Sequence, residues 1–197
     1  MAQTAFQLKY IIMIDKIIEE TKNGVVAAIK GTGDVVNTLR STVKDIVVGT
    51  MNDAGEVSNI AVGTIASISK GAITGAVSVG TTAADSAADI VEATIKGVSE
   101  VGGDIGGAIK SSISGVIHGT AEVSGDVATV AVNAVEGAIK TAGDLGADVS
   151  EATEHAVTGA IKAADEIGTD AGKSVRDALL ASAALPKDIV ESAIGKE

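Results

Sequence analysis

Aromatic residues are almost absent from this chain of 197 residues, which contains one Phe, one Tyr and no Trp. Because aromatic side chains supply much of the buried area of globular cores, a compact domain with a thick centre is not expected. Cysteine is absent as well, which excludes disulfides and thiolate metal sites and gives no information on the redox compartment. The apolar residues are mainly Ala, Val and Ile, and they predict thin elements that pack closely.

Basic residues are outnumbered, with 15 Lys and Arg against 26 Asp and Glu and a net charge of −11. Nucleic acids and anionic lipid surfaces both attract clustered Lys and Arg, so neither is expected as an electrostatic partner. No apolar run is long enough to cross a membrane, and no secretory cleavage site is apparent near the N-terminus. The compartment is therefore not encoded, and a cytoplasmic location is the default expectation.

A repeat of 22 residues organises most of the chain. Five clear copies run from Gly71 to Leu180, and two fainter copies begin at Ala27 and Gly49, giving seven units over residues 27–180. A period of this size indicates a repeat architecture. Before it, residues 1–26 form a separate apolar segment, and residues 181–197 form a tail around Pro186, the only proline.

Apolar residues recur within each unit at spacings of three and four, which is about 3.67 residues per turn and therefore a helical period. Acidic residues occupy the eighth and twelfth positions, on the opposite side, so each unit is an amphipathic helix. The third and ninth positions are expected to form the helix–helix interface, through Ile73, Val79, Ile95, Val101, Ile117, Val123, Ile139, Leu145, Ile161 and Ile167.

The expected fold class is all-α: one long amphipathic helix, or a helical hairpin turning at the glycines of residues 97–107, assembled into a bundle or coiled coil. Each glycine costs an exposed helix roughly 1 kcal/mol relative to Ala, so the helix must bury its stripe against another apolar surface. Glycine pairs four apart predict close helix approach, at 71/75, 102/106, 103/107 and 115/119. The alternative is a β-solenoid, which would show period-two alternation instead.

Residues 1–26 concentrate the large apolar side chains. Thr4 and Gln7 predict a helix start, and Asn23-Gly24 predicts its end. This helix is expected to close the end of a bundle, to dock on a partner protein or to lie in a membrane interface, and its predicted docking residues are Phe6, Tyr10, Met13, Ile14, Ile17 and Ile18. Pro186 predicts the end of the last repeat helix at about Leu185, and Lys187 to Ile194 form a short helix or a frayed tail.

Residues that carry chemistry are scarce. His118 and His155 lie on the polar side, and neither has a Ser or Asp at a spacing that indicates a nucleophile. Acid pairs such as Glu100 with Asp104 lie four residues apart and are interpreted as a solvated helix face. We therefore expect no enzyme activity, no cofactor and no metal site.

Segments such as EHAVTGAIKAADEIG and GAITGAVSVGTTAADSAADIV resemble the 11-residue-based repeats of perilipins, synucleins and group 3 late-embryogenesis proteins, and the period is also that of right-handed coiled coils. The resemblance implies a helix that forms on a lipid-droplet, membrane or drying surface. The polar face here is acidic, however, and the Ile column is more apolar than in those families. Both departures favour protein as the partner.

Two functions follow as expectations. The first is a non-enzymatic structural protein, a homo-oligomer that self-assembles through its apolar stripe into a bundle, tube or filament. It could scaffold a larger complex by binding a protein client through residues 1–26. The alternative is an amphipathic-helix coat on a lipid or storage-polymer surface.

Overall fold

The computed structural model describes the backbone of residues 2–32, 34–54 and 58–195, and the side chains of residues 11–31, 34–52 and 63–195. Within these ranges all regular structure is helical and no strand is present. The predicted all-α class is confirmed. The β-solenoid alternative is wrong for the described residues, as the spacings of three and four indicated.

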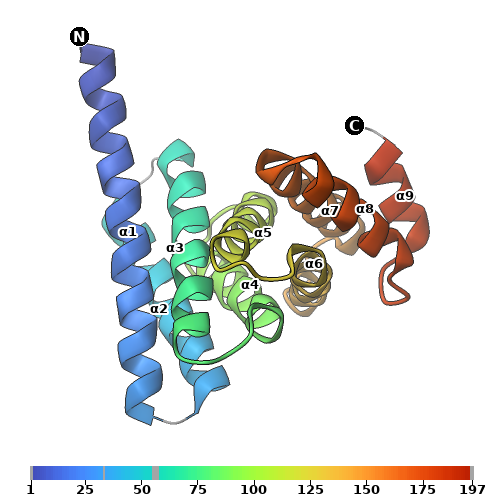
Figure 1. Ribbon diagram of the computed structural model, residues 1–197. Coiled ribbons are helices and arrows are strands. Elements are labelled where there is room, and N and C mark those ends of the chain that lie inside the picture. The colour runs from blue at the N-terminus through green and yellow to red at the C-terminus, as the bar shows by residue number, and fades with distance from the viewer. Residues whose placement is uncertain (1, 33, 55–57, 196–197) are drawn as a thin grey trace.

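Figure 1 shows the described helices as an array that runs from α1 at one end to α9 at the other. Odd-numbered helices pack on one another in one row, even-numbered helices in a second row, and α9 packs on α7 and α8. The helices are α1 (Ala2–Thr32), α2 (Val35–Ala54), α3 (Ser58–Ser78), α4 (Ala83–Glu100), α5 (Ile105–Glu122), α6 (Val127–Asp144), α7 (Val149–Ile167), α8 (Thr169–Ala181) and α9 (Lys187–Gly195).

The expectation of one continuous helix or one hairpin is wrong, because turns follow α3, α4, α5 and α6. At the tenth repeat position Gly80, Gly102 and Gly146 have φ of 97°, 71° and 74°, and Ser124 has φ of 54°. A left-handed residue ends an α-helix, and glycine adopts it at little cost. The 22-residue phase persists through each break because one period contains both a helical stretch and its turn.

The twelfth repeat position begins the next helix. Asp126 accepts hydrogen bonds from the backbone N–H groups of Ala128 and Thr129, which stabilises the start of α6. Asp148 caps α7 in the same way. The acid pairs therefore do not share a helix face: Glu100 ends α4, whereas Asp104 precedes α5.

Glycine notches set the spacing between helices in the same row. A Cβ at Gly115 of α5 would collide with the carbonyl oxygen of Ala66 in α3, and one at Gly71 of α3 would collide with that of Ile18 in α1. Gly75 and Gly119 make similar approaches, so these two predicted pairs do mark close helix contacts. The pairs 102/106 and 103/107 lie in and just after the α4–α5 turn, and among their glycines Gly106 makes the closest approach to another helix, since a Cβ there would lie 2.7 Å from the His155 side chain of α7.

The ends of the chain differ from the sequence expectation in two details. Helix α1 continues through Asn23-Gly24 to Thr32, so the predicted stop is wrong; Gly24 instead faces Ile46 of α2. Helix α8 ends at Ala181, four residues before the predicted end, while the short terminal helix is confirmed as α9.

Candidate functional site

The repeat residues predicted to form a helix–helix interface divide by position. At the third position Ile73, Ile95, Ile117 and Ile161 are fully buried, while Ile139 is half-buried. The ninth position lies at or just after the end of a helix, where Val79, Val101 and Val123 are half-buried and Leu145 and Ile167 are exposed. Neighbouring helices of the same chain therefore supply the apolar surface that the stripe requires.

The N-terminal helix uses its predicted docking residues in two ways. Ile14, Ile17 and Ile18 are half-buried, and Ile17 packs against the core. Met13 is 36% exposed, and its neighbours Ile11 and Ile12 are 53% and 59% exposed. We call Ile11, Ile12 and Met13 the N-terminal patch. Phe6 and Tyr10 lie outside the residues whose side chains are described.

A groove of about 330 Å³ lies between α1 and α2. We call it the α1–α2 groove; it is lined by Ile17, Glu20, Thr21, Asp45, Ile46, Gly49 and Thr50. Glu20 forms an exposed ion pair with Lys16, 3.4 Å apart, on the same helix. No sequence motif marks the residues of α2 in this groove, although Asp45 occupies the same repeat position as Asp89.

An ion-pair network joins α2 to α4 in the even-numbered row. The guanidinium of Arg40 donates to one carboxylate oxygen of Asp89 at 2.9 and 2.5 Å, and it lies 3.3 Å from Glu92. The hydrogen bond to Asp89 raises the pKa of Arg40. Burial alone would raise the pKa of Glu92, but the hydrogen bond from Lys96 and the charge of Arg40 lower it. A cation of one helix thus reaches acids two helices further along the chain.

The fold brings His118 close to two groups that the sequence did not indicate. Its Nδ1 lies 3.3 Å from the Ser114 hydroxyl and 2.8 Å from the Ser114 carbonyl oxygen, and its Nε2 lies 3.4 Å from Glu166. Because Nδ1 must donate its proton to the carbonyl at 2.8 Å, it cannot accept the proton of the Ser114 hydroxyl. The arrangement therefore gives His118 polar partners on α5 and α7 and does not activate the serine.

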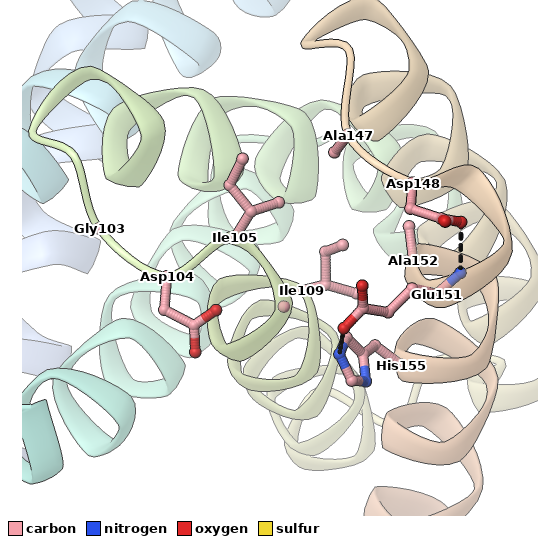
Figure 2. A pocket seen from close by; sticks show the side chains of 10 residues that line it. Gly103, Asp104, Ile105, Ile109, Ala147, Asp148, Glu151, Ala152 and His155 are labelled. Carbon is pink, nitrogen blue, oxygen red and sulfur yellow. Dashed lines mark hydrogen bonds and ion pairs between the residues drawn. The ribbon is translucent and has the colours of Figure 1, made fainter.

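A second cleft, of about 310 Å³, lies between the first turns of α5 and α7. Figure 2 shows Asp104 on one side and Asp148, Glu151 and His155 on the other. Asp148 is engaged in capping α7, and His155 Nε2 lies 3.4 Å from Glu151. Asp148 and His155 thus both have partners within α7. Within the described part of the chain, no three His, Asp or Glu side chains are grouped closely enough to hold a metal ion.

Comparison with known protein families finds no match, and no curated protein is significantly similar to the chain. The resemblance to perilipins, synucleins and late-embryogenesis proteins therefore stays a prediction. None of the helices, as far as they are described, is long and apolar enough to cross a membrane.

Proposed function

We propose that this chain is a non-enzymatic structural protein, a helical-repeat scaffold that self-associates through its N-terminal patch. The observation that carries the proposal is the exposure of Ile11, Ile12 and Met13, three consecutive large apolar side chains near one end of the array. Burying an exposed Ile stabilises an interface by roughly 1.5 kcal/mol or more. Large apolar residues gathered in this way are typical of interaction sites.

The apolar stripe of the repeats is less suited to assembly than the patch. Ile73, Ile95, Ile117 and Ile161 would reach another molecule only if the array opened and lost its own core. The same argument weighs against a coat that spreads the stripe over a lipid or polymer surface. Contact with either kind of partner is expected at the N-terminal patch instead.

Sedimentation velocity of the full chain over a range of concentrations tests the proposal. The wild type is expected to form a defined oligomer, and Ile12→Glu is expected to shift it towards monomer. Val36→Glu is the matched control, because Val36 is a 47% exposed apolar residue at the start of α2 and lies outside the patch. A monomer at every concentration refutes self-association, and flotation with lipid vesicles then tests the coat.

A further inference from the structure

Each helix of the even-numbered row contacts the preceding helix of that row through residues at the same repeat position. Asp45 of α2, Asp89 of α4 and Asn133 of α6 are spaced 44 residues apart, which is two repeats. Asp89 accepts hydrogen bonds from Arg40 of α2. Asn133 donates from Nδ2 to the backbone carbonyl of Ala84 in α4, at 2.9 Å. This position therefore binds the preceding helix of the row.

The backbones of neighbouring helices in this row also approach each other at a fixed repeat position. A Cβ at Gly137 of α6 would lie 3.0 Å from Cα of Ala88 in α4, which shows how tightly the two helices meet. Gly49 occupies the same repeat position on α2, where no described heavy atom lies within 4 Å of a Cβ built on it. Ile90 of α4 is fully buried, whereas its equivalent Ile46 is half-buried and lines the α1–α2 groove.

We propose that the α1–α2 groove is the docking site for an amphipathic helix of a partner protein, with an Arg or Lys that reaches Asp45 and small or apolar residues that cover Ile46 and Gly49. Acidic Glu20 and Asp45 lie on the two walls, and the net charge of −11 attracts a basic partner at long range. This partner would be a client of the scaffold proposed above, and it would bind a surface other than the N-terminal patch.

A second copy of the chain is a poorer occupant. In a head-to-tail contact, α8 of another copy would take the place before α2 in the even-numbered row. Gly172, Val175 and Leu179 of α8 are, however, already buried. Arg176 donates to both carboxylate oxygens of Asp165, at 2.8 and 2.6 Å. Two copies meeting groove to groove would bring the acidic walls together, and like charges oppose such a contact.

The probe is a labelled peptide with the sequence of Val35–Ala54. In the chain itself this helix, α2, packs on the equivalent surface of α4, and its Arg40 binds Asp89 there. Binding of the peptide to the full chain is measured by fluorescence anisotropy at low salt. We expect saturable binding that weakens at least about tenfold in the Asp45→Arg protein. A peptide carrying Arg40→Glu should bind the wild type weakly and regain affinity for the Asp45→Arg protein. Absence of saturable binding, or equal binding to both proteins, overturns the proposal.

Two further variants of the chain show where the peptide binds. Loss of binding in Asp89→Asn but not in Asp45→Arg would mean that the peptide replaces the chain's own α2, and this overturns the proposal. Binding retained by the Ile12→Glu protein supports a groove formed within one chain, whereas binding lost there refutes it. Because self-association is read separately by sedimentation, its failure is distinguishable from failure of the groove.

Discussion

Replacement of Gly102 by alanine tests whether the chain turns between α4 and α5 or continues as the single helix that the repeat phase favours. In the structure Gly102 has φ of 71°, and no described heavy atom lies within 4 Å of a Cβ built on it. The substitution therefore changes backbone energy without a clash. A side chain in the left-handed region costs about 1–2 kcal/mol, partly offset because alanine restricts the unfolded chain more than glycine does.

The expected result is a loss of about 1 kcal/mol in the free energy of unfolding, or about 2–4 °C in Tm for a chain of this size. A continuous helix through Gly102 would give the opposite sign, because alanine in place of glycine stabilises a helix interior by about 1 kcal/mol. The sign of the change, more than its size, therefore decides between the two structures.

Urea denaturation followed by circular dichroism measures the effect, with two matched variants. Gly49→Ala is the helix-interior control, since Gly49 lies within α2 with open space around it, and it is expected to stabilise the protein. Ser124→Gly should also stabilise it, because Ser124 holds the same turn position with φ of 54°. A gain in stability from Gly102→Ala would refute the turn.

Three further predictions address packing, polar burial and acid stability. Gly115→Ala should cost about 1–3 kcal/mol in urea denaturation, because its Cβ would strike the Ala66 carbonyl oxygen; a neutral result would contradict the notch. Ser111→Ala should gain about 1 kcal/mol in the same assay, because its buried hydroxyl has no hydrogen-bond partner among the described residues, and a loss would argue against this. Hydrogen bonds from the hydroxyl and N–H of Thr129 lower the pKa of Asp126 below its ordinary 3.8. Its stabilising effect is thus complete above about pH 4 and disappears as pH falls through the lowered pKa. Asp126→Asn keeps the capping oxygen, so its unfolding free energy should change less between pH 5 and 2, and an unchanged pH profile would disprove the link.

The candidate surfaces were only partly accessible to sequence reasoning. Residues 1–26 are apolar enough to predict a contact region, yet the sequence does not say that Ile17 packs inward while Ile12 faces solvent. The equivalence of Asp45 and Asp89 is present in the repeat alignment. Its meaning depends on the hydrogen bond from Arg40 of α2 to Asp89 of α4, a contact that only the folded array creates.

The sequence by itself determined that the chain is helical and that each unit carries an apolar stripe in need of a second apolar surface, because side-chain spacing fixes which side of a helix is apolar. The tertiary structure decided where that surface comes from. A left-handed residue at the tenth position, such as Gly102, reverses the chain so that successive helices cover one another's stripes. Hydrophobic periodicity cannot encode this choice, since a straight helix and a series of turned helices preserve the same 22-residue period.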